Sequence, residues 1–292
     1  MRKYLYILLA ASAVLGCTKQ WNDLVSENEA RGKQNVDPWD EPEPEPEPEP
    51  EVEGPQLYNM SFDNWSKDGK YDVCYGENAT DAEKAVWASA NSTTAMLGYP
   101  TVGPEEVFIA SLEEGKKAVK LQTQGMSILF GAIKKLAAGS IYTGRTGKID
   151  IAKMSAAIYW GVPFSERPKA LEGYACYLPG TIDWVQEPYK DMKGQLDNGH
   201  IFVVLADWDE PFEVSPPDKL FDPETDAGVI GYGKVVFDNT MDYYETFTVN
   251  IEYRNDSTPK YVAIVASSSA LGDYFTGSSA SVLYLDELKF KY

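Results

Sequence analysis

Several acidic side chains lie close enough together in the sequence to suggest acid–base chemistry. Asp207, Asp209 and Glu210 fall within four residues, and Asp183 and Glu187 are available as partners. Hydrolysis of a glycosidic bond needs two carboxyl groups, about 5–5.5 Å apart for retention or about 6.5–9.5 Å apart for inversion. A chain with 45 acidic residues offers such pairs by chance. Asp207 and Asp209 are therefore weak candidates for catalysis.

Other catalytic patterns are missing from the sequence. It contains no Gly-x-Ser-x-Gly elbow and no His-Glu-x-x-His helix motif. Its one histidine, His200, stands between Gly199 and an apolar run, a context that favours a core or edge position over catalysis. One histidine also makes a zinc site improbable without carboxylate ligands.

Tryptophan side chains near polar residues suggest a surface for sugar rings, whose C–H faces stack on aromatic rings. Trp184 follows Asp183 after a Pro-Gly turn, and Trp208 stands between two aspartates at the end of a predicted strand. We expect both indoles to be exposed and to stack on a glycan, with Asp183 beside them. The alternative for each tryptophan is a place in the core.

Two further side chains are candidates for binding. Arg167 precedes a proline in an irregular segment, where it could bind a sugar hydroxyl or carboxylate, or pair with Glu166 or Glu172. Asp286 falls on the apolar face of the predicted last strand. A carboxylate there must be protonated, hydrogen-bonded or bound to a metal ion.

The elements that position these residues are predicted to be β-strands. Apolar residues alternate with polar ones from Ser281 to Tyr292, where we place Val282, Tyr284, Leu288 and Phe290 on one face. Similar patterns predict strands over 116–123, 200–205, 246–253 and 260–266. The one helix-compatible stretch is Ile128 to Ala138. Many short strands with long polar connections indicate an antiparallel β-sandwich.

The net charge limits the kinds of ligand that the chain can bind, and the cysteine content limits its disulfide bonds. The formal net charge is −19, and a surface this acidic repels polyphosphate and anionic lipid, so we expect no nucleic-acid binding. Cys74 and Cys176 could pair in an oxidising compartment, but two buried free thiols are the favoured interpretation.

The N-terminus has the pattern of an exported, lipidated protein. Two basic residues precede an apolar run of about a dozen residues, which is typical of a secretory signal and too short to span a bilayer. Val14-Leu15-Gly16-Cys17 resembles the bacterial lipoprotein cleavage box, in which the cysteine is lipidated. The residue after Cys17 is Thr18 rather than aspartate, which points to the outer membrane.

A tether is predicted between the lipid and the folded region. Glu41 to Glu51 is a strict alternation of Glu and Pro, which excludes a helix and favours an extended polyproline-type segment. We therefore expect three parts: a signal peptide over 1–17, a disordered tether over 18–54, and one β domain over 55–292.

A series of short strings in the β domain carries a family resemblance. In order they are Phe62-Asp63-Asn64-Trp65, Trp87-Ala88-Ser89-Ala90-Asn91, Gly161-Val162-Pro163-Phe164, Arg167-Pro168, Leu171-Glu172-Gly173-Tyr174, Tyr177-Leu178-Pro179-Gly180, Ser267-Ser268-Ser269, Gly272-Asp273-Tyr274-Phe275-Thr276-Gly277 and Leu283-Tyr284-Leu285-Asp286-Glu287. Their order and spacing resemble the carbohydrate metabolism domain of Bacteroides-type lipoproteins. The resemblance implies a jelly-roll sandwich similar to galactose-binding-like modules, an envelope location and a part in glycan use.

The resemblance also implies a structural calcium ion. Jelly-roll carbohydrate modules often carry one where the first and last strands meet, and the string around Asp286 is similar to their closing motif. Backbone carbonyls near 59–63 could complete the oxygen shell. The alternative is that Asp286 accepts hydrogen bonds from backbone amides.

Three functions remain open from the sequence. The first is a non-catalytic glycan-binding lipoprotein of the outer membrane that assists carbohydrate use, with the lipid as its membrane contact. The second is a glycoside hydrolase with paired carboxylates. The third is a surface adhesin or structural protein that binds an outer-membrane protein.

Overall fold

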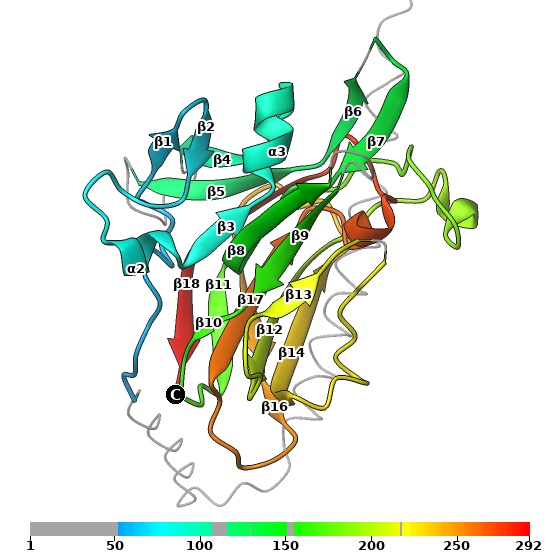
Figure 1. The fold of residues 1–292 in the computed structure, drawn as a ribbon. Coiled ribbons are helices and arrows are strands. Elements are labelled where there is room, and N and C mark those ends of the chain that lie inside the picture. Colours follow the sequence, from blue (N-terminus) through cyan, green and yellow to red (C-terminus); the bar gives the residue numbers. More distant parts are fainter. Residues whose placement is uncertain (1–51, 107–115, 129, 151–154, 217) are drawn as a thin grey trace, which may run out of the picture. The chain divides into compact units, whose positions relative to one another are not determined.

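The computed structural model describes residues 52–106, 116–128, 130–150, 155–216 and 218–292. Two antiparallel β-sheets form the fold (Figure 1), so the predicted antiparallel β-sandwich is confirmed. Cys17 and the whole Glu–Pro segment, Glu41 to Glu51, lie outside the described residues. No helix within the described ranges is long and apolar enough to cross a membrane.

The larger sheet has nine strands, seven of them in the order β13-β9-β8-β17-β12-β14-β16, with β10 on β17 and β3 on β8. Its strands are β3 (Trp87–Ser89), β8 (Ser140–Asp150), β9 (Ser155–Trp160), β10 (Val162–Pro163), β12 (Gly199–Ala206), β13 (Phe212–Val214), β14 (Val229–Phe237), β16 (Glu252–Tyr253) and β17 (Tyr261–Ser267).

The smaller sheet has the order β15-β11-β18-β5-β4. Its strands are β4 (Val102–Glu106), β5 (Lys117–Gln122), β11 (Ala170–Leu178), β15 (Glu245–Asn250) and β18 (Val282–Lys291). Two hairpins stand apart, β1 (Ser66–Asp68) with β2 (Tyr71–Val73) and β6 (Gln124–Ile128) with β7 (Ile133–Ala137). The helices are single turns: α2 (Asp81–Lys84), α3 (Asn91–Thr94), η1 (Ala95–Leu97), η2 (Lys190–Met192) and η3 (Gly272–Tyr274).

The central strands of the larger sheet are buried on both faces. On β12, Ile201, Val203 and Leu205 belong to the core between the sheets. The alternate residues Phe202 and Val204 belong to a second apolar cluster on the outer face. Successive side chains of a strand point to opposite faces, so an unbroken apolar run fits a strand that is covered on both sides.

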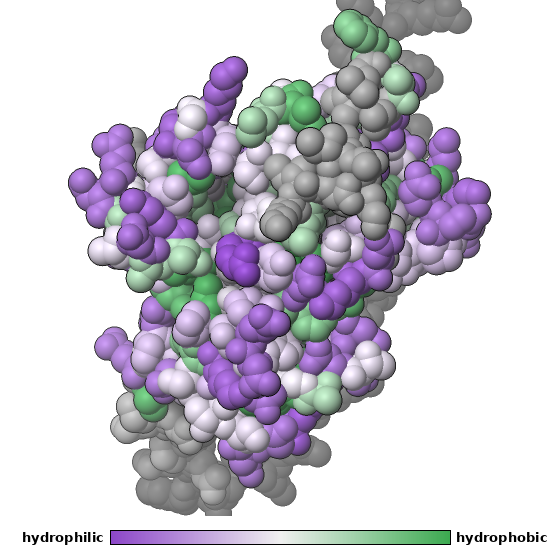
Figure 2. All heavy atoms as spheres, in the orientation of Figure 1, coloured by the Kyte–Doolittle hydropathy of each residue, from purple (hydrophilic) through white to green (hydrophobic). Residues whose placement is uncertain are grey.

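The second cluster forms because the chain after β12 folds back over the sheet. Trp208, Phe212 and Phe221 pack on the outer face, with ring centroids 5.2 Å apart for Trp208 and Phe212 and 5.3 Å apart for Phe212 and Phe221. Hydrophilic residues cover most of the visible surface, and apolar ones reach it only in small separate areas (Figure 2). Side chains of this chain therefore cover much of the outer face of the larger sheet.

The helix-compatible stretch Ile128–Ala138 is a hairpin turn and strand instead, so that interpretation is wrong. Phe130 and Gly131 both have positive φ, 55° and 89°, and reverse the chain between β6 and β7. Hydrogen bonding between the two strands satisfies the backbone, and Leu136 is buried. Hairpin β6–β7 extends beyond the two sheets (Figure 1).

Cys74 and Cys176 are both buried and free, which confirms the prediction of separate thiols. Burial raises the pKa of both thiols. Each therefore stays protonated near neutral pH and serves as a small core residue.

Candidate functional site

A cavity lies on the outer face of the larger sheet, next to the aromatic cluster. We call it the outer-face cavity. Its narrow part, about 50 Å³, is lined by Ser140, Tyr142, Ile158, Trp160, His200, Phe202, Val265, Ser267, Ser269, Ala270, Gly272 and Asp273. The lining comes from the adjacent strands β9, β8, β17 and β12 of the larger sheet and from the turn η3 with the residues before it. Residues from distant parts of the sequence thus converge on one small space.

Two residues that line this cavity each carry a buried nitrogen with no hydrogen-bond partner among the described residues. These nitrogens are Nε1 of Trp160, whose side chain is 4% exposed, and Nδ1 of His200, which is 8% exposed. The carboxylate of Asp273 also accepts no hydrogen bond from the described part of the chain. Buried polar groups are nearly always paired, and each unpaired one costs about 1–3 kcal/mol. Two such nitrogens on residues that line one cavity, together with the half-buried carboxylate of Asp273, therefore indicate a ligand site.

The rings around these groups are held rigidly. Trp160 packs edge-to-face on Phe202 and Phe221, at centroid distances of 5.6 and 5.8 Å. His200 packs edge-to-face on Phe202 at 5.3 Å. Such contacts add about 0.5–1.5 kcal/mol to the burial of the rings. The indole and imidazole are therefore pre-positioned for a ligand.

Burial also sets the charges in the cavity. It raises the pKa of Asp273 to about 6. Burial, with a smaller effect from Lys234, lowers the pKa of His200 to about 3. At neutral pH the site therefore holds one carboxylate, a neutral imidazole with one donor and one acceptor nitrogen, and an indole N–H donor.

A wider space of about 150 Å³ adjoins the narrow part and shares five of its lining residues, Ser140, Tyr142, Ile158, Gly272 and Asp273. Its walls are mostly apolar, from α3, β6, β7 and β9, and include Leu97, Met126, Leu136, Ala156 and Phe275. A polar end with an apolar approach suits a ligand that has hydroxyl groups and C–H faces.

The turn that carries Asp273 is anchored by another buried aspartate, Asp197. One oxygen of Asp197 accepts hydrogen bonds from Oγ of Ser269 at 2.6 Å, N of Ser278 at 2.8 Å and Oγ of Ser281 at 2.8 Å. Its other oxygen accepts from N of Asn198 at 2.9 Å. Ser269, which belongs to one of the strings of the family resemblance, thus has a structural role. Asp197 fixes both ends of the segment around η3.

The structure also has a larger and more open cleft, of about 610 Å³, beside hairpin β1–β2. Trp65, Tyr75 and three lysines line it. Lys67 pairs with Asp72 at 2.7 Å, and Asp68 accepts a hydrogen bond from Tyr71. No orphaned nitrogen lies among its described lining residues. We therefore favour the outer-face cavity.

The two predicted stacking tryptophans do not share a groove. Trp208 is only 9% exposed and its Nε1 donates to Oδ1 of Asp226 at 3.1 Å, so its expected exposure is wrong. The reason is the chain segment that folds back over the sheet. Trp184 is half-buried, pairs through its backbone with Gly277, and packs its indole against Gly125. Neither lines the outer-face cavity.

Arg167 and Asp183 bind other parts of the chain. Nη1 of Arg167 donates to the carbonyl of Ser257, and Nη2 donates to that of Asn255 at 2.9 Å. Its guanidinium lies 4.0 Å from the ring centroid of Tyr253. Arg167 thus braces a loop and makes neither predicted ion pair. Asp183 accepts hydrogen bonds from N and Oγ of Ser279, at 2.9 and 2.6 Å.

The predicted catalytic carboxylates lie away from the cavity. Asp207 and Asp209 are exposed and follow the end of β12, whereas His200 is near its start. At about 3.3 Å per residue, the strand separates the two sites by roughly 20 Å. Oδ1 of Asp209 also accepts from Nζ of Lys260 at 2.9 Å. Sequence reasoning chose these side chains and missed Trp160, Asp197 and Asp273.

With the fold and the cavity described, the chain can be compared with known proteins. The sequence model of the family described as "Putative carbohydrate metabolism domain" matches residues 61–291. The chain belongs to this family. The resemblance seen in the short strings of the sequence is therefore confirmed. No curated protein matches the chain.

Two solved structures of proteins from Bacteroides have a fold similar to that of this chain. One, a putative glycoside hydrolase from Bacteroides thetaiotaomicron, has a TM-score of 0.59 and 21% identity, covering 82% of this chain and 72% of that one. The other, a putative glycoside hydrolase from Bacteroides vulgatus, has a TM-score of 0.57 and 16% identity, covering 80% and 97%. At these identities the likeness concerns the fold alone.

In this member of the family, a β-bulge in β18 changes the predicted position of Asp286. The pairing of β18 with β11 shifts between Glu172 and Tyr174, so that Glu287 and Leu288 together face Gly173. Glu287 has φ 48°, and a side chain at Gly173 would collide with Leu288. Before the bulge Leu283 and Leu285 face the core, and after it Leu288 and Phe290 do. Asp286 therefore lies on the face of the smaller sheet that points away from the core. Its predicted place on the same face as Leu288 is wrong.

Asp286 is nevertheless only 1% exposed. Its Oδ1 accepts from N of Glu287 at 2.8 Å, and its Oδ2 has no partner among the described residues. The alternative, in which Asp286 accepts hydrogen bonds from backbone amides, therefore holds for one of its two oxygens. Burial raises the pKa of Asp286 to about 7 against the hydrogen bond from N of Glu287, and the charges of Glu287 and Asp63 add to the increase, whereas Lys116 opposes it.

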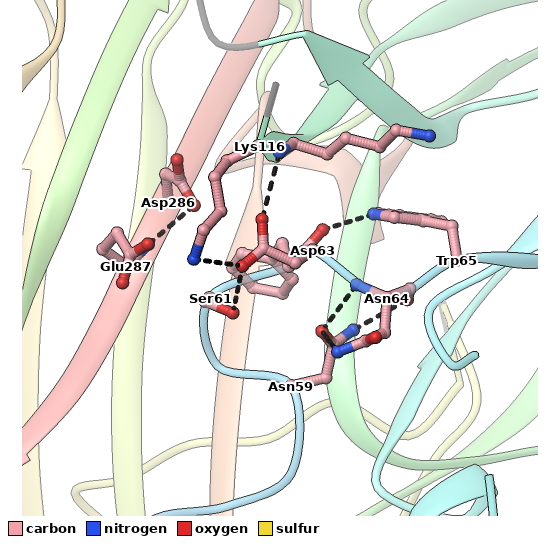
Figure 3. A network of polar contacts seen from close by, with 10 residues as sticks. Asn59, Ser61, Asp63, Asn64, Trp65, Lys116, Asp286 and Glu287 are labelled. Atoms are coloured by element: carbon pink, nitrogen blue, oxygen red, sulfur yellow. Dashed lines mark hydrogen bonds and ion pairs between the residues drawn. The ribbon is translucent and has the colours of Figure 1, made fainter. Parts of the chain in front are cut away.

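The surroundings of Asp286 include the ammonium group of a lysine. Figure 3 shows the ammonium group of Lys116 between Asp63 on one side and Asp286 and Glu287 on the other. Nζ of Lys116 is 3.1 Å from Oδ2 of Asp63. Calcium needs six to eight oxygen ligands, and no group of three metal-binding side chains occurs in the described residues. A cation belonging to the chain is present where the metal was expected.

Replacement of Asp286 with asparagine should change the pH dependence of stability. The folded-state pKa is above the unfolded value of about 3.9, so the wild type is destabilised as pH rises from about 4 to about 7. The variant should not show this decrease in the free energy of unfolding, which we expect to amount to about 2–4 kcal/mol in the wild type. Urea unfolding at pH 4 and pH 8, with exposed Asp256→Asn as control, measures it. Equal differences between variant and wild type at both pH values would contradict it.

Proposed function

We propose that this chain is a glycan-binding lipoprotein of the cell envelope that assists carbohydrate use without catalysing a reaction. The outer-face cavity carries the proposal, because Trp160 and His200 each leave one nitrogen unsatisfied beside the carboxylate of Asp273. Membership of a carbohydrate metabolism family agrees with a glycan ligand. The export signal and Cys17 support an envelope location.

Sugar hydroxyl groups can supply the hydrogen-bond partners that these side chains lack in the free protein. The indole N–H of Trp160 can donate to a sugar oxygen, and the Asp273 carboxylate can accept from a hydroxyl. Neutral His200 can act as donor or acceptor. The apolar walls that include Tyr142 and Phe275 can pack on the C–H faces of the ring. A hexose would thus satisfy the buried groups that the fold leaves unpaired.

The same cavity supports binding better than hydrolysis. Asp273 is the one carboxylate among its described lining residues, and the common glycosidase mechanisms require two. One observation favours the hydrolase alternative: a carboxyl with a pKa of about 6 could act as a general acid. We therefore keep hydrolysis as the second candidate function.

A glycan array with two matched variants tests the proposal. Trp160→Phe keeps an aromatic ring in the cluster and removes the unpaired N–H, so the array signal should fall about tenfold or more. Trp208→Phe makes the same change in a neighbouring tryptophan whose N–H is already used by Asp226. It should bind glycans like the wild type. Equal binding by all three proteins would refute the role of the cavity.

An assay of sugar release separates binding from hydrolysis. Incubation of the wild type with the glycans found on the array should leave them intact. Release of sugar that disappears in Asp273→Asn, but persists in Asp209→Asn, would instead establish a hydrolase at the cavity. Loss in Asp209→Asn alone would return catalysis to the exposed carboxylates.

Lipidation at Cys17 has a direct test. Cells that express the full chain should incorporate labelled palmitate into it and hold it in the outer-membrane fraction. Cys17→Ala should abolish both the label and the membrane fraction. A labelled Cys17→Ala variant would contradict the anchor. A pull-down from the membrane fraction that finds a protein partner while the array stays blank would favour an adhesin.

A further inference from the structure

We infer that the outer-face cavity takes the uncharged terminal sugar of a glycan and excludes carboxylated or sulfated ends. This inference rests on the proposed glycan binding and adds the ligand class. Two observations support it, the shape of the cavity and the charges of its described lining residues.

The shape favours a chain end over the middle of a chain. The narrow part has about 50 Å³, and Trp160, His200 and Phe202 are among its lining residues. A cavity needs about 10–15 Å³ of such volume to hold one water molecule, so this space accommodates a few heavy atoms only. A polysaccharide cannot pass through it. A terminal ring can instead occupy the wider part and extend one hydroxyl or hydroxymethyl group into the narrow part.

The charges oppose an anionic ligand. Asp273 is acidic, and His200 is neutral at physiological pH. No lysine or arginine is among the described residues that line either part. Lys135 is near, but its ammonium lies over the Phe275 ring, 4.4 Å from the centroid. A carboxylate or sulfate on the sugar would thus meet a like charge without a compensating cation, which is costly in a desolvated site.

Binding to matched oligosaccharides tests this inference. The probes are neutral tri- and hexasaccharides from the array, the same compounds oxidised to a uronate at the terminal C6, and their sulfated forms. We expect the wild type to prefer the neutral forms about tenfold or more. Asp273→Asn should bind the neutral forms more weakly and lose most of the preference. The trisaccharide and hexasaccharide should bind equally well, since only the end is held.

The outcomes separate the two levels of the proposal. If no glycan binds, the proposed function fails. If anionic forms bind as well as neutral ones, or affinity rises steeply with chain length, the function stands and the inference about an uncharged end fails. Thermal unfolding of Asp273→Asn and of the control Asp209→Asn verifies that both variants fold.

A second inference rests on the polar network at the end of the sandwich. The geometry points to Lys116 as a built-in cation that replaces a metal ion. Oδ2 of Asp63 binds both Nζ of Lys116, at 3.1 Å, and Oγ of Ser61, at 3.0 Å, while its Oδ1 accepts from N of Lys117 at 3.2 Å. Asp286 and Glu287 approach the same ammonium from the last strand (Figure 3). The carbonyl of Met60 also accepts from N of Leu288. The first segment of the domain is thus joined to the bulge.

Thermal unfolding tests the role of Lys116. The melting temperature of the full chain should change by less than about 1 °C with a chelator or with added calcium. Lys116→Met should lower it by about 3 °C or more, because several acidic groups lose their cation. The control Lys120→Met removes a lysine that pairs with one carboxylate, Glu105, and lies over the ring of Tyr284, and it should change the melting temperature little. A wild type that is destabilised by the chelator, or an unchanged Lys116→Met, would overturn the inference.

Discussion

Replacement of Asp273 with asparagine is expected to weaken glycan binding by about 10- to 100-fold and to leave the free protein at least as stable. The binding loss follows because a hydrogen bond to a charged group contributes about 1.5–3 kcal/mol. The stability gain follows because desolvation of this half-buried carboxyl group raises its pKa, so that its ionised form destabilises the folded state. Few substitutions combine a loss of binding with a gain in stability, and the combination is characteristic of a ligand site.

The pKa of Asp273 determines the direction in which the stability difference between variant and wild type changes with pH. The folded-state pKa of Asp273 is about 6 and the unfolded value is about 3.9, so ionisation destabilises the wild type as pH rises through this window. We expect Asp273→Asn to exceed the wild type by about 1–2 kcal/mol at pH 7.5 and by nothing at pH 4. Calorimetric titration with a glycan and urea unfolding at both pH values provide the measurements. A variant that binds like the wild type, or that is less stable at pH 7.5, would contradict the role of Asp273.

Replacement of Asp197 with alanine is expected to be the most destabilising polar substitution in the domain. Asp197 is 3% exposed, and its loss leaves N of Ser278 and Oγ of Ser281 without their acceptor, while Oγ of Ser269 keeps only Thr123 as a partner. At about 1–3 kcal/mol for each unsatisfied group, the free energy of unfolding should fall by about 3 kcal/mol or more. The melting temperature should fall by about 6 °C or more.

Asp191→Ala is the matched control, because Asp191 is exposed in the same connecting segment. Its effect should stay within about 0.5 kcal/mol. Asp197→Asn keeps the size of the side chain but places an amide against donors, so an intermediate loss is expected. Since Asp197 anchors η3, both Asp197 variants should also bind glycans more weakly. If Asp197→Ala melted like the wild type, the anchoring role would be refuted.

The fold was accessible from the sequence because local patterns determine it. Alternation over β15 and the apolar run of β12 predict strands directly, and Gly, Pro, Asn and Asp clusters separate them. Tight backbone features escaped the same reasoning. Two successive left-handed residues turn Ile128–Ala138 into a hairpin, and the left-handed Glu287 moves Asp286 to the other face. A single such residue reverses the face of every side chain beyond it.

The site was less accessible because burial and pairing depend on contacts between distant segments. Trp208 is flanked by two acidic residues and looks exposed, yet the chain after β12 covers it. Trp160 has an apolar sequence context and looks like core, yet its N–H is left unpaired at a cavity. Two signals in the sequence pointed toward the site: His200 is the single histidine of the chain, and Asp273 falls in one of the strings that carry the family resemblance. The meaning of His200 depends on Asp273, which is 73 residues away in sequence.

A crystal structure of the full β domain with its best array glycan tests the central claim most directly. We expect a terminal sugar ring in the outer-face cavity, with an oxygen within about 3.2 Å of Nε1 of Trp160 and a hydroxyl donating to Asp273. The remainder of the glycan should leave through the wider part, past Leu136 and Phe275. A glycan bound instead at the open cleft, over Trp65 and Tyr75, would contradict the assignment of the outer-face cavity as the binding site.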